Sequence, residues 1–216
     1  MKSLNIAVLK KEADIFAQIE SSQHEKSIYG TTDGKAIGTY FEHKFQAYLK
    51  SKYTYQEGNS ARGIDFPELE VDMKTTSIKQ PQSSCPFRSA EQKIYGLGYS
   101  LLVFVYDKTD DHQQRTGNMN ILHVIFVNKE HTADYQITRQ ICNNLDNDGN
   151  SDDIVALLMD KNLPVDDISV RDLAARILSN KPKIGYLTIS NALQWRLQYS
   201  RIIEKAGEVE GVIRLK

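Results

Sequence analysis

Two aspartates and a lysine stand at a spacing suited to phosphodiester chemistry. They lie in the segment RGIDFPELEVDMKTTS, where Asp65 is followed after a short gap by Asp72 and Lys74. Alternate side chains of a β-strand share one face, so Glu70, Asp72 and Lys74 point the same way if residues 69–78 form a strand. The sequence therefore predicts two acids and a lysine lined up along one strand.

The pair of aspartates predicts a site for a divalent cation. We expect residues 61–66 to form the preceding strand, and the connection at Pro67 to bring Asp65 beside Asp72. Two adjacent carboxylates repel each other, and a hard cation such as Mg²⁺ relieves that repulsion. Lys74 would then stabilise developing negative charge or help to orient and deprotonate an attacking water. The alternative for these residues is a solvated strand face with a surface ion pair.

These side chains need a scaffold, and the hydrophobic pattern predicts one. Residues 36–51 place Ile37, Phe41, Phe45 and Leu49 on one helical stripe. In chain order, the predicted elements are helical segments at 3–28 and 36–51, strands at 53–58, 61–66 and 69–78, a short helix within 84–98, and strands at 100–108 and 120–129. The last two are almost continuously apolar, which is typical of strands buried on both faces.

The pattern changes after residue 130 to one of helices. Helices are predicted around residues 135–141, 152–163 and 169–180, then from the cap residue Ser190 to Gly207, with a final strand at 210–216. Helix, turn, helix and short strand match a winged helix-turn-helix by pattern alone. We therefore expect a catalytic core with N-terminal helices at 1–130 and a helical, winged-helix-like DNA-contacting region at 131–216.

The motif resembles that of the PD-(D/E)xK nuclease superfamily, here as Asp65 followed by Asp72-Met73-Lys74. Ile64 replaces the proline that usually precedes the first acid. The resemblance covers about residues 36–127. It implies the α/β fold class, with a restriction-endonuclease-like α/β/α core, a mixed central sheet and a mostly helical C-terminal region. It also implies catalysis with Mg²⁺, for which Mn²⁺ can substitute.

The resemblance adds candidate residues around this motif. Glu42, on the helix before the strands, is expected as a further catalytic acid and a ligand of metal or water. Glu70 shares the predicted face of Asp72 and is an alternative metal ligand, while Gln92 and Lys93 on the crossover helix could assist catalysis. Ordinary solvent exposure is the alternative for all four residues.

Composition narrows the class of protein. The chain has 216 residues, of which 40% are hydrophobic and 25% charged, as in ordinary globular proteins. No signal peptide or membrane-length apolar run is present, so we expect a cytoplasmic protein with no membrane contact. The two cysteines, Cys85 and Cys142, support neither a disulfide framework nor a zinc knuckle. The net charge of −1 decides nothing about DNA binding.

The family resemblance favours a type II restriction endonuclease that acts as a homodimer on a short specific sequence in double-stranded DNA. A DNA repair or junction-resolving nuclease would share the three catalytic residues. A non-catalytic helix-turn-helix regulator is the alternative from another class, but it leaves the acid and lysine pattern without a purpose. Five C-terminal cations form either a phosphate-contacting face or solvated surface: Lys181, Lys183, Arg196, Arg201 and Lys205.

Overall fold

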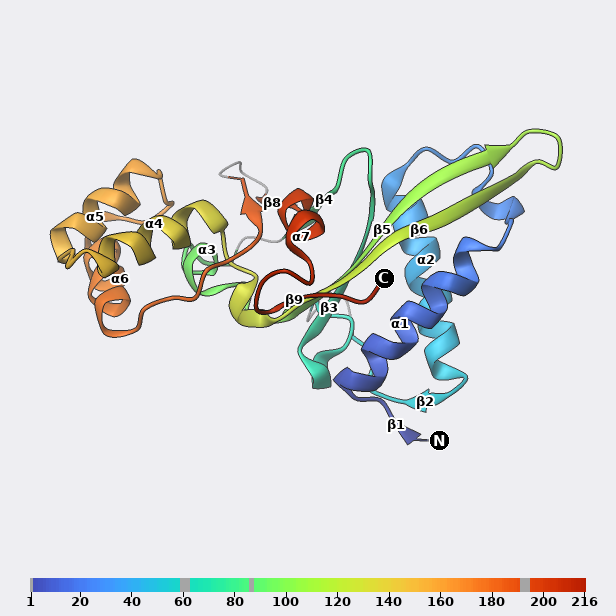
Figure 1. Ribbon diagram of the computed structural model, residues 1–216, viewed down its shortest axis with the longest axis horizontal. Coiled ribbons are helices and arrows are strands. Elements are labelled where there is room, and N and C mark those ends of the chain that lie inside the picture. Colours follow the sequence, from blue (N-terminus) through green and yellow to red (C-terminus); the bar gives the residue numbers. More distant parts are fainter. Residues whose placement is uncertain (1, 59–62, 86–87, 191–194) are drawn as a thin grey trace. The chain divides into compact units, whose positions relative to one another are not determined.

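The computed structural model describes residues 2–58, 63–85, 88–190 and 195–216. The chain forms two compact units (Figure 1). The first consists of Met1–Gln82, Ser100–Val127 and Lys205–Lys216, and the second of Ser83–Tyr99 and Asn128–Glu204. The division expected at residue 130 therefore differs from this one in two segments, since 83–99 belong to the second unit and the C-terminus returns to the first.

The first unit is built on a four-stranded mixed sheet with the strand order β3-β5-β6-β9. Its strands are β3 (Val71–Ser77), β5 (Ser100–Asp111), β6 (Thr116–Val127) and β9 (Val212–Arg214). Strands β3 and β5 are parallel, whereas β6 runs antiparallel to both β5 and β9. The structure thus confirms a mixed α/β architecture, and it places β3 at one edge of the described sheet.

Two long helices cover one face of this sheet, α1 (Ile6–Ser21) and α2 (Gly34–Lys50) (Figure 1). Helix α2 begins where the Asp33 side chain accepts a hydrogen bond from the backbone N–H of Lys35. The predicted stripe of Ile37, Phe41, Phe45 and Leu49 is fully buried on that face. Burial of this stripe fixes the rotation of α2 about its axis, and this rotation determines which side chains of α2 lie next to β3.

Short elements join the helices to the sheet; the predicted strand at 53–58 is shortened to its first two residues, and the described residues 63–66 of the strand predicted at 61–66 do not form it. The connecting elements are β1 (Lys2–Ser3), η1 (Lys26–Ile28), β2 (Tyr53–Thr54) and η2 (Pro67–Leu69). Strand β2 stops at Thr54, and residues 63–66 form no extended strand. Gly63 has a left-handed backbone with φ of 63°, which breaks a strand. Residues 61 and 62 lie outside the described ranges.

The second unit combines helices with a small sheet. Its elements are α3 (Gln92–Tyr95), η3 (Lys129–His131), α4 (Tyr135–Asp146), α5 (Ser151–Asp160), α6 (Asp167–Ser179), β7 (Thr188–Ile189), most of β4 (Gln82–Cys85), β8 (Trp195–Gln198), and α7 (Ser200–Lys205) except its last residue. The three strands pair in the order β4-β8-β7. A separate core joins the helices, with Ile94, Ile141, Ile154 and Leu173 among its buried members.

The predicted helix from Ser190 to Gly207 is largely wrong. Strand β8 occupies its middle and pairs with β7, leaving only α7 as helix; residues 191–194 lie outside the described ranges. Ser190 does not cap a helix, because its hydroxyl oxygen accepts a hydrogen bond from the Arg196 N–H across the strand pair. Leu197 and Tyr199 are both fully buried, and this two-residue alternation favours a strand. The helix-turn-helix pattern therefore lacks its second long helix.

None of the helices in the described ranges combines the length and the apolar character needed to cross a membrane.

Candidate active site

Strand β3 carries the two central residues of the motif on the face opposite the α1 and α2 core. Val71 and Met73 belong to that core, so Asp72 and Lys74 point away from it. The Asp72 side chain is buried, with 4% of its surface exposed, and its Oδ2 lies 2.7 Å from Lys74 Nζ. The alternation predicted for residues 69–78 holds within β3 and brings an acid and a lysine into direct contact.

Asp65 reaches this pair from a turn rather than from a strand. Phe66 pairs with Val71 across the turn formed by η2, which folds the chain back on itself. The Asp65 Oδ2 then accepts a hydrogen bond of 2.8 Å from the backbone N–H of Met73, and its carboxyl group lies within hydrogen-bonding reach of Asp72. The two acids are side by side, as predicted, but a tight turn places them there.

A glycine makes this turn possible. The Gly58 N–H donates to the Asp65 carbonyl oxygen over 2.9 Å. A Cβ atom at position 58 would lie 1.9 Å from the carbonyl oxygen of Ile64, which no real side chain tolerates. The sequence analysis did not identify Gly58 as a site residue, although the isolated glycine at the end of YTYQEG is a signal of close backbone approach.

The charge balance at this site is unfavourable to ionised acids. Burial raises the pKa of Asp72 to about 7; the Lys74 ammonium opposes this shift, and the Asp65 carboxylate adds to it. The ion pair with Lys74 therefore only partly offsets the loss of water around Asp72. An added cation would favour the ionised form of Asp72.

Glu42 joins the same site from helix α2. Burial, followed by the nearby Asp65 carboxylate, raises the pKa of Glu42 to about 7, while Lys74 acts in the opposite direction. A cavity of about 230 Å³ contains all four charged groups. It is lined by Glu42, Gly58, Gly63, Ile64, Asp65, Asp72, Met73 and Lys74. We call it the site cavity.

Glu70 does not take the position predicted for it. It precedes β3 with a left-handed backbone, φ of 51°, at the end of η2, so it does not share the alternation of the strand. Its side chain is exposed and does not line the site cavity. The expected role of Glu70 as a metal ligand is therefore not supported by its location.

Gln92 and Lys93 are held by contacts inside the second unit. Lys93 is 1% exposed and donates a hydrogen bond of 3.0 Å to the Ile189 carbonyl oxygen, with Asp134 nearby. Gln92 donates to the Leu97 carbonyl oxygen and accepts from the Arg88 N–H. Both side chains join loops to helix α3, and neither lines the site cavity.

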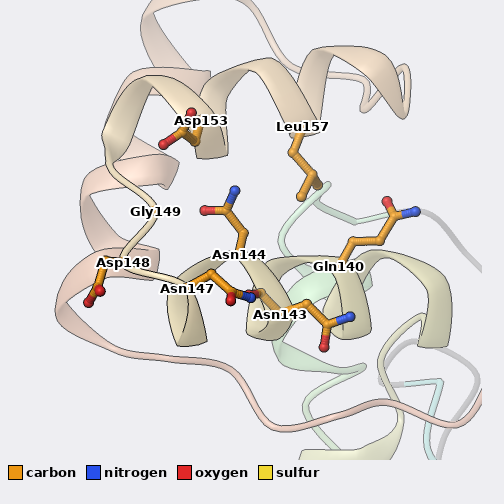
Figure 2. Close-up of a pocket in the computed structure, with 8 residues that line it drawn as sticks. All are labelled: Gln140, Asn143, Asn144, Asn147, Asp148, Gly149, Asp153 and Leu157. Carbon is orange, nitrogen blue, oxygen red and sulfur yellow. The ribbon is translucent and has the colours of Figure 1, made fainter.

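A larger cavity of about 510 Å³ lies between α4 and α5 in the second unit. Figure 2 shows Asn144 and Leu157 reaching into it from the two helices. Its lining includes the acids Asp148 and Asp153 but no lysine or arginine. Asp153 is also engaged in the cap of α5, where it accepts from the Asn150 N–H. This cavity lacks the cation beside paired acids that marks the site cavity.

Comparison with known proteins identifies the family. The family model described as "Type II restriction enzyme NspV" matches residues 3–214. The type II restriction enzyme NspV of Nostoc sp. (strain ATCC 29411 / PCC 7524) is 59% identical over 213 residues, covering 99% of this chain and 97% of that protein. The chain belongs to the NspV family of type II restriction enzymes. No solved structure matches this member of the NspV family.

Membership in the NspV family decides between the functions left open by the sequence motif. It confirms a type II restriction enzyme, which acts on double-stranded DNA, over a repair nuclease or a non-catalytic regulator. The match spans both units, so the second unit is part of what defines the NspV family.

Proposed function

We propose that Asp65, Asp72 and Lys74 form the catalytic centre of this restriction enzyme and that Glu42 assists them. The observation that carries the proposal is the contact of 2.7 Å between Lys74 Nζ and Asp72 Oδ2, with Asp65 beside them in one cavity. Hydrolysis of a phosphodiester needs neutralisation of charge and a positioned water, and these groups can supply both.

The acid pair fits a divalent cation such as Mg²⁺. Within the described ranges, no three acidic, histidine or cysteine side chains stand close enough to hold a metal ion on their own. Mg²⁺ commonly uses only one or two carboxylates together with waters and substrate phosphate. Asp65 and Asp72 would provide those two carboxylates. The raised pKa of Asp72 shows that its negative charge is unfavourable in the metal-free site, and a bound cation would stabilise that charge. Mn²⁺ is a hard cation and would suit the same oxygen ligands.

Each residue then has a distinct task. The bound cation would supply Lewis-acid polarisation of the scissile phosphate. The Met73 N–H holds Asp65 in place, so that this carboxylate keeps one orientation. Lys74, fixed by Asp72, presents its ammonium group where negative charge develops or where the attacking water is oriented. Glu42, with a pKa of about 7, can accept or return a proton near neutral pH.

The first unit further supports a restriction-endonuclease-like core of the PD-(D/E)xK superfamily. A mixed sheet carries the acid and lysine on its edge strand β3, and a preceding helix, α2, contributes an acid to the same cavity. The resemblance in the sequence was based on the acid and lysine motif and on the order of elements, of which the three successive strands expected before residue 79 are reduced to β2 and β3 in the described residues. The second unit and the cations of the C-terminal region are candidates for DNA contact.

The enzyme is proposed to act as a homodimer. One catalytic centre cleaves one DNA strand at a time, and a symmetric DNA sequence presents two equivalent strands. Analytical ultracentrifugation in the presence of cognate DNA measures the number of chains bound. A single chain that still makes complete double-strand breaks would contradict this proposal.

The test of the catalytic centre compares Asp72→Asn and Lys74→Ala with the unmodified enzyme on long duplex DNA of known sequence. Lys79→Ala is the matched control, because Lys79 is a largely exposed lysine in the same unit. With Mg²⁺ we expect both site variants to lose about 100- to 1,000-fold or more in cleavage rate. With EDTA we expect Lys74→Ala to retain DNA affinity. Near-normal cleavage by both folded variants would mean that the catalytic centre lies elsewhere.

A further inference from the structure

Two arginines flank one tyrosine ring in the second unit. The Arg201 guanidinium carbon, on α7, lies 3.7 Å from the centroid of the Tyr135 ring at the start of α4. Arg139, one turn further along α4, lies 5.8 Å from the same centroid, and its Nη1 donates a hydrogen bond of 3.2 Å to the Tyr135 hydroxyl. We call these three residues the Tyr135 cluster.

No described carboxylate neutralises the two positive charges of the Tyr135 cluster by an ion pair. Among the described residues, neither Arg139 nor Arg201 forms an ion pair with a carboxylate. The Arg201 Nε is buried and has no hydrogen-bond partner in the described part of the chain. A buried N–H group without a partner is unfavourable unless something else accepts its hydrogen bond.

The structure also separates the cations that the sequence grouped together. Lys181 pairs with Asp146, and Lys205 lies 3.1 Å from Glu208, so local acids compensate both charges. Arg201 pairs with no such acid in residues 2–58, 63–85, 88–190 and 195–216, and it stacks instead on an aromatic ring. Stacking on a ring orients the guanidinium in advance, and less conformational entropy is then lost when it binds an anion.

The two ends of helix α4 differ in charge. The cavity between the C-terminal half of α4 and α5 has Asp148 and Asp153 in its lining (Figure 2). The N-terminal end carries Arg139 together with Arg201 from α7, and the acid that caps the helix there, Asp134, is buried and lies near the Lys93 ammonium. An anionic ligand would therefore be repelled at the first end and attracted at the second. A planar guanidinium with fixed N–H groups matches the oxygens of a phosphate diester.

We propose that the Tyr135 cluster binds a backbone phosphate of the DNA substrate through Arg201, assisted by Arg139. The inference rests on the restriction activity, and it assigns these arginines to positioning the duplex rather than to chemistry or base reading. A phosphate contact contributes the same free energy to every DNA sequence, so cognate and non-cognate DNA should lose affinity together when it is removed.

The experiment measures DNA affinity in EDTA, where no cleavage occurs, as a function of salt concentration. Arg201→Gln removes the charge, and Arg171→Gln, an exposed arginine on α6 of the same unit, is the matched control. The slope of log affinity against log salt is negative, and we expect Arg201→Gln to make it less steep by about 0.9, the value for one lost phosphate contact. Arg139→Gln should change it in the same direction. A slope and affinity equal to those of Arg171→Gln would overturn the proposal.

Three further measurements separate the phosphate contact from other roles. Arg201→Lys keeps the charge and should restore the salt slope, but only part of the affinity, because an ammonium group lacks the planar fork that stacks on Tyr135. A purely structural role would instead show as a lower melting temperature with an unchanged salt slope. Loss of cognate affinity alone would assign Arg201 to base reading and also overturn the proposal. Inorganic phosphate at constant ionic strength should not raise the melting temperature; stabilisation that Arg201→Gln abolishes would indicate a free-anion site instead of a DNA contact.

Failure here is distinguishable from failure of the catalytic proposal. Arg201→Gln should cleave at a normal rate once low salt and high enzyme concentration saturate the DNA. Lys74→Ala should bind normally and fail to cleave under the same conditions.

Discussion

Replacing Asp72 by asparagine should stabilise the metal-free protein at alkaline pH. The carboxyl is almost fully buried, and burial raises its pKa from 3.8 to about 7 against the opposing influence of Lys74. Because the folded pKa lies above the unfolded one, the folded state binds the proton more tightly between these two values. Stability is therefore lost as pH rises from the unfolded pKa to the folded pKa, and the loss is complete above about pH 7.

The size of this effect follows from the pKa. One pKa unit corresponds to about 1.4 kcal/mol, and two units lie between pH 5 and the folded pKa of about 7. Asp72 should thus lower the free energy of unfolding by about 3 kcal/mol between pH 5 and pH 8. The asparagine variant lacks this contribution. For a chain of this size the difference corresponds to roughly 6–12 °C in melting temperature.

The assay is thermal unfolding in EDTA at pH 5 and pH 8 for the unmodified protein and for Asp72→Asn. Glu68→Gln is the control, since it removes an exposed carboxylate from the turn that precedes β3. The favourable influence of Lys74 on the ionised carboxylate is already contained in the pKa of about 7, and comparing two pH values for each protein cancels effects of the substitution that do not depend on pH. Mg²⁺ at pH 8 should raise the melting temperature of the unmodified protein and leave that of Asp72→Asn unchanged. Equal pH dependence of the two proteins would refute the reasoning.

Three further outcomes are expected. Glu42→Gln should lower the cleavage rate about 10- to 100-fold at saturating Mg²⁺ and DNA, the usual effect of losing a group that orients a metal site, whereas an unchanged rate would remove Glu42 from the site. Gly58→Ala should reduce both cleavage and melting temperature because its Cβ would collide with the backbone before Asp65, while Gly34→Ala, which meets no atom within 4 Å, should change neither. Lys93→Met should destabilise the protein by about 3 kcal/mol, since Asp134 loses a buried cation. It should leave the rate of cleavage unchanged at low temperature, whereas the loss of a catalytic lysine would reduce that rate.

Part of the candidate site was predictable because it depends on local periodicity. The alternation of residues 71–77 placed Asp72 and Lys74 on one face, and the structure shows the two side chains in contact. The four-residue spacing of Ile37, Phe41 and Phe45 likewise predicted the buried face of α2. Such patterns require only the geometry of one element, which neighbouring residues fix.

Other features were wrong because they depend on contacts between distant residues. Lys93 looked like an assisting group, but Ile189 and Asp134 hold it in the interior of the second unit. Residues 195–198 were predicted as helix, although pairing with β7 makes them a strand. In both cases the structure depends on a contact with a residue far away in the sequence, and the local sequence pattern carries no information about that contact.

The sequence by itself determined the acid and lysine motif, the long helices and the buried strands, since each follows from side-chain type and spacing along a single element. Only the tertiary structure decided that Asp65 arrives from a turn, that Glu42 enters the same cavity and that Glu70 does not. It also decided that Arg139 and Arg201 lie beside Tyr135 without an ion pair to any carboxylate that the structure describes. The physical reason is that burial, pKa and charge pairing depend on the groups that folding brings together, and these groups belong to segments far apart in the chain.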